Sequence, residues 1–179
     1  MKKINIFCFG FGQVAKNFIY NLNKTYEVNL ATTSREKTQK KKIYGINYTS
    51  YHFLDNYFDK QILKVIKDYE YILISIPPKN GTDIVIKNFQ NILKNLNLSW
   101  ITYLSATSVY GDHKGEWVNE NSKVKPLTEN AKSRLAAEKL WINLAKKKLP
   151  LQIFRLSGIY SQERNILKKI KTGSHRIIN

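Results

Sequence analysis

The stretch NIFCFGFGQVAKNFIYNL, from Asn5 to Leu22, joins a short apolar run to an amphipathic segment through two glycines. The apolar run that ends at Gly10 predicts a buried strand. The segment from Gln13 to Asn23 predicts a helix, because apolar residues recur on one face at helical spacing: Val14, Phe18, Ile19 and Leu22. A helix that starts directly after a strand presents free N–H groups and a partial positive charge at its N-terminus. The turn is therefore a predicted anion-binding site.

The alternation of strand and helix continues along the chain. We expect further strands at residues 26–33, 44–51, 71–78, 100–106 and 151–157, and further helices at 59–69, 82–96 and 131–147. Thr82 or Asp83 is placed to cap the helix 82–96. This alternation predicts an α/β fold, a Rossmann-type doubly wound parallel sheet of about six strands with helices on both faces. At 179 residues, we expect one domain, residues 1–179.

In such a sheet, the first strand-to-helix turn binds the pyrophosphate of a dinucleotide. Gly10, Gly12 and Ala15 form the pattern G-x-G-x-x-A. The first glycine permits the tight turn, the second lets the backbone approach the phosphates, and the small third residue lets helix and strand pack closely. Since a second expected strand ends about 20 residues later, the context supports dinucleotide binding over an ordinary turn.

The end of that second strand favours NADP over NAD. An NAD site places Asp or Glu there to accept a hydrogen bond from the ribose 2′-hydroxyl. Here Thr33, Ser34 and Arg35 offer hydroxyls and a guanidinium that suit a 2′-phosphate. The alternative is that Arg35 is only the first residue of a solvated basic run.

The amino-acid composition limits the classes of partner that we expect. A net charge of +17 suits a polyanion, but the richness in Lys, Asn, Ile and Tyr also fits an A/T-rich coding bias, so we expect no nucleic-acid partner. The basic runs 35–42, 146–148 and 168–171 are expected to be solvated. No apolar stretch reaches the roughly 20 residues of a membrane helix, so we expect a soluble protein without membrane contact.

Cysteine and histidine offer no metal site. The single cysteine, Cys8, lies in the first apolar run and is expected to be a buried, reduced thiol of a cytoplasmic protein. His52, His113 and His175 are scattered without metal-ligand spacing. His113, beside Asp112, is a weak candidate acid/base, and the alternative is a solvated loop histidine.

Several motifs follow the fifth expected strand. They are Ser105, VYGD from Val109, Gly115, Glu120, Pro126, RLAAEKLW from Arg134 and RLSGIYS from Arg155. At these residues the sequence resembles the extended and atypical short-chain dehydrogenase/reductases, relatives of the NAD-dependent epimerases and dehydratases, and especially their YeeZ-like subgroup. The resemblance covers nearly the whole chain. It implies redox chemistry at a sugar or alcohol carbon, with a tyrosine as acid/base, a lysine four residues later, and a Ser or Thr that orients the substrate oxygen.

At all three of these positions the chain carries other residue types. Ala106 stands at the substrate-orienting position, Asn130 at the tyrosine position and Arg134 at the lysine position. Asn exchanges no proton near neutral pH, and Arg stays protonated. Phe9 stands where extended members usually carry their first glycine. The substrate subdomain that follows the sixth strand in the family is largely missing here, and a truncated reading frame would explain it.

The sequence therefore predicts an NADP-binding protein related to nucleotide-sugar epimerases, dehydratases and reductases, with impaired or absent redox catalysis. One alternative is a non-catalytic dinucleotide sensor or degenerate remnant, and a further one is a basic nucleic-acid-binding protein. The sequence leaves the substrate open, with a nucleotide sugar as one candidate class. The expected cofactor-binding residues are Gly10, Gly12, Gln13, Val14, Ala15, Thr33, Ser34, Arg35, Pro77 and Ser105.

Overall fold

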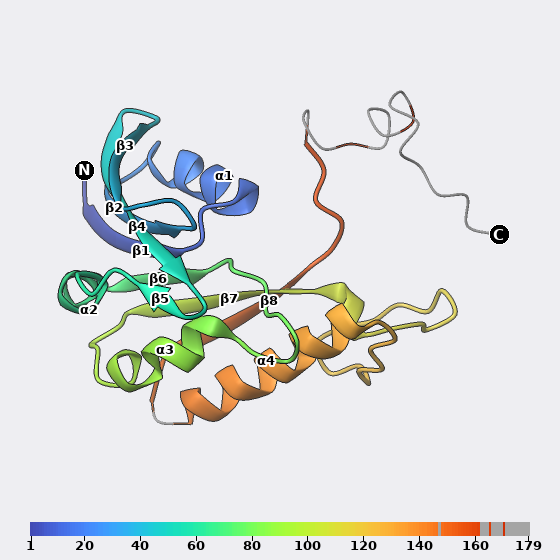
Figure 1. The fold of residues 1–179 in the computed structure, drawn as a ribbon. Coiled ribbons are helices and arrows are strands. Elements are labelled where there is room, and N and C mark those ends of the chain that lie inside the picture. The colour runs from blue at the N-terminus through green and yellow to red at the C-terminus, as the bar shows by residue number, and fades with distance from the viewer. Residues whose placement is uncertain (147, 162–164, 166–169, 171–179) are drawn as a thin grey trace.

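A computed structural model describes residues 1–146, 148–161, 165 and 170 (Figure 1). Its strands form one sheet in the order β3-β4-β2-β1-β6-β7-β8, with β5 paired to β4. The strands are β1 (Lys3–Phe9), β2 (Glu27–Ser34), β3 (Gln39–Ile43), β4 (Ile46–Leu54), β5 (Tyr57–Phe58), β6 (Tyr71–Ile74), β7 (Trp100–Ala106) and β8 (Leu151–Leu156). The helices are α1 (Gln13–Leu22), α2 (Ile62–Val65), α3 (Ile84–Leu93) and α4 (Glu129–Ala145), with short 3₁₀ turns at Ile66–Asp68 and Thr107–Val109.

The sheet is doubly wound, as the sequence predicts. The chain runs from β1 through β2 to β4 in one direction, and from β6 through β7 to β8 in the other, with all neighbouring pairs among these six strands parallel. Figure 1 shows α1 on one face of the sheet and α3 and α4 on the other. The expected Rossmann-type α/β fold is confirmed. Among the described residues, no helix is long and apolar enough to span a bilayer.

The expected alternation of strand and helix is wrong between β2 and β4. The basic segment after β2 contains β3, which pairs antiparallel with β4, from Gln39 opposite Ser50 to Ile43 opposite Ile46. Tyr44 and Gly45 connect the two strands, and both have positive φ, 51° and 81°. Positive φ at both positions is the geometry of the two-residue turn that matches strand twist. Since the lysines of this run carry no apolar stripe, the segment forms an edge strand and no helix.

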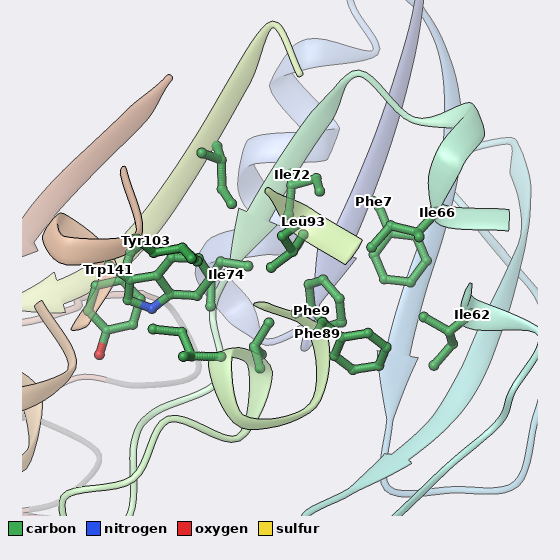
Figure 2. Close-up of a cluster of buried hydrophobic side chains, with 14 of the residues drawn as sticks. Phe7, Phe9, Ile62, Ile66, Ile72, Ile74, Phe89, Leu93, Tyr103 and Trp141 are labelled. Atoms are coloured by element: carbon green, nitrogen blue, oxygen red, sulfur yellow. The ribbon is translucent and has the colours of Figure 1, made fainter. Parts of the chain in front are cut away.

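Two apolar clusters hold the helices against the sheet. The larger lies under α2, α3 and α4, and its largest buried side chains include Phe7, Phe9, Phe89, Tyr103 and Trp141 (Figure 2). The smaller lies under α1 and contains Ile6, Ala15, Ile19 and the fully buried Cys8. Val14 and Leu22 pack at its margin, whereas Phe18 is 37% exposed and stacks on Trp100. The predicted apolar face of α1 is therefore only partly buried.

Helix boundaries differ from the expectation mainly at α2. The predicted helix 59–69 is reduced to the four residues of α2 and a 3₁₀ turn. Of the two candidate caps for α3, Asp83 is the one used: its Oδ1 accepts from the N–H groups of Val85 and Ile86, at 2.9 and 3.1 Å. Its Oδ2 accepts from Trp141 Nε1 at 2.9 Å. Burial raises the pKa of Asp83. For α4, the predicted end at residue 147 lies outside the described residues.

A buried ion pair joins α4 to β8. Glu138 is 1% exposed, and Arg155 donates to it through Nη2 at 2.8 Å and through Nε at 3.1 Å. The guanidinium of Arg155 also lies 4.8 Å from the centre of the Tyr110 ring. This arrangement holds the guanidinium in its charged form and raises the pKa of Arg155. Glu138 is the buried partner, whereas the Arg155 side chain is 20% exposed. Removal of Arg155 would therefore leave a buried carboxylate without compensation.

We predict that Glu138→Ala lowers the free energy of unfolding by about 2 kcal/mol, because the partly buried Arg155 would lose its counterion and two charge-assisted hydrogen bonds. Urea unfolding followed by circular dichroism measures this change. Glu129→Ala is the matched control, since its pair with Lys132 is exposed and should contribute less than about 1 kcal/mol. Equal losses in the two variants would contradict the prediction.

Candidate functional site

Gly10 forms the turn at the end of β1 and is required there by geometry. Its φ of +79° is one that side-chain-bearing residues rarely adopt. A Cβ at this position would lie 2.8 Å from Ile76 Cγ1 and 2.9 Å from Ser75 Oγ. The N–H of Gly10 donates to Thr33 Oγ1 at 2.9 Å. The first glycine of the motif therefore closes the turn against β2 and β6.

Gly12 differs from Gly10 because the space beside it is open. Its backbone is extended, with φ −80° and ψ −172°, and a Cβ would meet nothing within 4 Å. Gly12 is the N-cap of α1, and it offers no side chain to the free N–H groups of the first turn. Ala15, the third small residue, is fully buried against the sheet. The turn is thus enclosed at Gly10, open at Gly12 and packed against the sheet at Ala15.

The turn lies where the winding of the sheet reverses. β1 pairs with β2 on one side and β6 on the other, and the chain proceeds outward in opposite directions from these two central strands. At the end of β6, the Ser75 N–H continues the pairing by donating to Phe9 O at 2.9 Å. In open parallel sheets, ligands bind in the crevice at this point. Ser75 was missed by the sequence analysis, since only the fold brings it to Gly10.

The three residues at the end of β2 have different surroundings. Thr33 is buried, and its hydroxyl accepts from Gly10. The Ser34 hydroxyl accepts from Ser50 at 3.1 Å. Arg35 is exposed, and no ion pair to it occurs within the part of the chain that the structure describes. Of the three, Arg35 has the side chain that is open to a ligand.

An acidic residue follows Arg35 but is already paired. Glu36 Oε2 accepts from Lys41 Nζ at 2.6 Å and from Gln39 Nε2 at 2.8 Å. The ammonium of Lys41 lowers the pKa of Glu36 and keeps the carboxylate charged. Since this carboxylate has cationic and amide partners on β3, it does not neutralise Arg35. The Glu36–Lys41 pair is not predictable from the sequence, because the basic run shows no strand pattern.

The end of β7 and the start of α4 hold the positions that the family resemblance assigns to catalysis. Ala106 ends β7, and Asn130 is exposed in the first turn of α4. Arg134 Nη1 donates to the carbonyl of Leu104 at 3.1 Å. Tyr103 is fully buried, and burial raises its pKa, so its phenol is no substitute for an exposed acid/base.

Two expected cofactor residues follow β6 and lie on β7, respectively. Pro77 is exposed after β6, while Ser105 is buried and its hydroxyl has no hydrogen-bond partner among the described residues.

The segment after β7 forms a loop whose two ends are held together. The Lys125 N–H donates to Tyr110 O at 3.0 Å. A Cβ on Gly111, which has φ +75°, would collide with the carbonyl oxygen of Lys125. His113 is half-buried in this loop, and its Nε2 lies 2.9 Å from Lys123 O. The expectation that His113 acts as an acid/base stays a prediction.

No cluster of three or more metal-ligating side chains occurs among the residues that the structure describes. His52 lies on β4 and packs edge-on against the Tyr57 ring. The predicted histidine His175 and the basic run 168–171 lie outside the described residues, apart from residue 170.

Solved structures share this fold. No family model and no curated protein matches the chain. A functionally unknown conserved protein from Silicibacter pomeroyi is 25% identical, with a TM-score of 0.69 over 93% of this chain and 56% of that chain. UDP-glucuronic acid 4-epimerase from Bacillus cereus, in complex with NAD, is 16% identical, with a TM-score of 0.76 over 94% of this chain and 64% of that chain. dTDP-glucose 4,6-dehydratase from Bacillus anthracis, in complex with NAD, is 16% identical, with a TM-score of 0.73 over 95% and 62%.

The neighbours thus include NAD-dependent nucleotide-sugar epimerases and dehydratases. At these identities the likeness concerns the fold. The chain spans 56–64% of the length of these neighbours.

We predict that the same substitution destabilises the protein more at Gly10 than at Gly12. Gly10→Ala should lower the free energy of unfolding by at least about 2 kcal/mol, because the positive φ and the contact with Ser75 and Ile76 both oppose a Cβ. Gly12→Ala should change it by less than about 1 kcal/mol, since its backbone is ordinary and the space is open. Urea unfolding of the two variants measures the difference, and equal destabilisation would contradict the geometry of the turn.

Proposed function

We propose that the chain binds NADP or NADPH, with the pyrophosphate at the N-terminus of α1. The observation that carries the proposal is the contrast at the turn: Gly10 is enclosed, whereas the space beside Gly12 is open to solvent. This space lies at the reversal point of the sheet, next to free helix N–H groups. The dinucleotide complexes among the structural neighbours support the same class of ligand.

The residues at the turn fit a diphosphate. The backbone N–H groups of Gln13 and Val14 belong to the first turn of α1, and no capping side chain or acidic residue competes there for an anion. Ala15 keeps the helix close to the sheet. Partial positive charge at a helix N-terminus and free N–H donors are the features by which such turns hold phosphate.

The end of β2 favours NADP over NAD. Arg35 would pair with the 2′-phosphate, and charge-assisted hydrogen bonds of this kind contribute roughly 1.5–3 kcal/mol. Glu36, the acidic residue that could accept from a ribose 2′-hydroxyl, is bound by Lys41 and Gln39. In this proposal Ser34 and Thr33 shape the site, with Thr33 holding Gly10 in place.

On the nicotinamide side, Pro77 and Ser105 complete the proposed cofactor set at the ends of β6 and β7. A bound nicotinamide supplies hydride-transfer chemistry, but this chain offers little to complete it. Asn130 has no proton to exchange near neutral pH, Ala106 has no hydroxyl, and Arg134 is a fixed cation. We therefore propose a binding protein related to nucleotide-sugar epimerases and dehydratases, in which redox catalysis is impaired or absent. Ala106, Asn130 and Arg134 favour a non-catalytic dinucleotide sensor.

Binding is tested by calorimetric titration with NADPH and NADH. NADPH should bind at least tenfold more tightly than NADH, and Arg35→Asp should remove or reverse that preference. Gly12→Val should lower the affinity for both cofactors at least tenfold, since the valine side chain would fill the space assigned to the pyrophosphate.

Lys37→Asp is the matched control for Arg35→Asp, because it makes the same charge change on an exposed residue two positions along the chain. It should leave the NADPH preference within threefold of the parent value. Equal affinity of the parent protein for NADPH and NADH would overturn the NADP assignment, and unchanged affinity in a folded Gly12→Val variant would overturn the site.

Loss of catalysis has its own test. NADPH oxidation with carbonyl compounds and a panel of nucleotide sugars should not exceed the rate seen with Gly12→Val. Turnover above that background would show that other residues replace the missing acid/base. The triple variant Ala106→Ser/Asn130→Tyr/Arg134→Lys tests whether these three positions suffice to restore turnover.

A further inference from the structure

A negative charge lies beside the positive charge that the proposed cofactor site uses. Glu36 follows Arg35 in the connection between β2 and β3, and it is the only Asp or Glu from Val28 to Leu54. An acid at the end of the second strand accepts from the ribose 2′-hydroxyl of NAD, whereas a guanidinium pairs with the 2′-phosphate of NADP. The connection therefore carries a residue suited to each cofactor, side by side.

Glu36 is held from β3 through one carboxylate oxygen. Its Oε2 accepts from Lys41 Nζ at 2.6 Å and from Gln39 Nε2 at 2.8 Å. Both donors belong to the same face of β3, because residues two positions apart on a strand share a face. The amide of Gln39 adds a hydrogen bond without a charge. Among the described residues, Lys41 is the cation that pairs with Glu36, so the neutralisation of this carboxylate comes from Lys41.

The face of β3 that carries Lys41 is the face next to the glycine turn. Lys41 pairs with Tyr48 of β4, and residues that are directly opposite on antiparallel strands share a face. Tyr48 packs against the apolar cluster under α1. Its ring centre lies 5.5 Å from that of Phe11, which belongs to the turn between β1 and α1. Lys41 therefore lies on the side of the sheet that carries the proposed pyrophosphate site.

The two neighbouring lysines of β3 belong to the other face. Side chains alternate along a strand, so Lys40 and Lys42 lie opposite in direction to Lys41. Both are exposed, and neither takes part in an ion pair within the part of the chain that the structure describes. The basic run thus contains one lysine placed to act on Glu36 and two that are not.

Glu36 is ionised beside the proposed site. The hydrogen bond from Lys41 and its positive charge lower the pKa of Glu36. Loss of Lys41 would not remove the negative charge at neutral pH, since an unperturbed glutamate has a pKa of about 4.3. It would leave an unneutralised carboxylate one residue from Arg35. Such a carboxylate repels a phosphate, or pairs with the guanidinium that the phosphate needs.

We propose that Lys41 sets the cofactor preference of this chain by neutralising Glu36, so that Arg35 is free to bind a 2′-phosphate. This inference rests on the NADP site proposed at Arg35. Without Lys41, the carboxylate opposes the 2′-phosphate of NADPH but not the 2′-hydroxyl of NADH. The specificity of the site thus depends on a side chain of β3, outside the turn that binds the pyrophosphate.

The proposal is tested by calorimetric titration of the parent protein and three variants with NADPH and NADH. Lys41→Met should lower the ratio of NADPH affinity to NADH affinity at least about tenfold, because like charges then meet at the 2′-phosphate. It should bind NADH at least as tightly as the parent does, which also shows that the variant is folded. Glu36→Gln should not lower the ratio. The double variant Lys41→Met/Glu36→Gln should recover the parent ratio to within about threefold, since it carries no carboxylate to repel the phosphate.

Lys40→Met is the matched control, because it removes the same charge from the adjacent residue on the opposite face of β3. It should leave the ratio within about threefold of the parent value. A double variant that keeps the low ratio of Lys41→Met would show that Lys41 contacts the phosphate itself, and would overturn the proposal. Loss of NADH binding in Lys41→Met would overturn it as well.

Failure of this inference is distinct from failure of the cofactor site. A parent protein that prefers NADPH, with the same preference in Lys41→Met, would leave the NADP site standing and overturn the role of Lys41 alone. A parent protein that binds NADPH and NADH equally would overturn both.

Discussion

The N–H group of Gly10 donates to the Thr33 hydroxyl, and this bond ties the end of β1 to the end of β2. The positive φ of Gly10 turns the chain out of the sheet beside Ser75 and Ile76, where a side chain would not fit. Because α1 begins three residues later, the place of its N-terminus over the sheet follows from this turn. The open space at Gly12 and the burial of Ala15 depend on it in turn. The geometry of the candidate site thus rests on one residue without a side chain and one buried hydroxyl.

The helix α4 is held to the sheet by polar contacts on the face that carries Arg134, Glu138 and Trp141. These side chains bind, in order, the carbonyl of Leu104, the guanidinium of Arg155 and the carboxylate of Asp83. Spacings of four and three residues place all three on one side of a helix. Hydrogen bonds have directions, whereas apolar contacts do not, so this face fixes the rotation of α4 about its axis. Arg134 is therefore held against β7 by the same set of contacts that holds the helix.

Much of the fold was predictable from local pattern. The strands around Ile6, Ile72 and Tyr103 are short apolar runs between turns, and α3 has both its apolar face and its Asp83 cap in the sequence. The hairpin of β3 and β4 was missed because its lysines follow no apolar alternation, and its pairing depends on a turn at Tyr44 that few residues of that type adopt. The motif at Gly10, Gly12 and Ala15 was predictable because its spacing is local. Ser75 beside Gly10, the Lys41 bond to Glu36 and the Arg155 bond to Glu138 required the fold, since each depends on which segments the sheet brings together.

The contact between Tyr110 and Lys125 joins the two ends of the loop after β7. The hydrogen bond between Tyr110 and Lys125 and the close approach of Gly111 to Lys125 fix the distance between β7 and α4. This distance does not depend on the sequence of the loop between them. Compact loops whose ends meet in this way can change in sequence and length while the scaffold stays the same. During evolution, residues 112–124 can therefore be exchanged for a loop of another sequence or length. Substitutions there would remodel the surface beside α4 and β8 at little cost to the stability of the sheet.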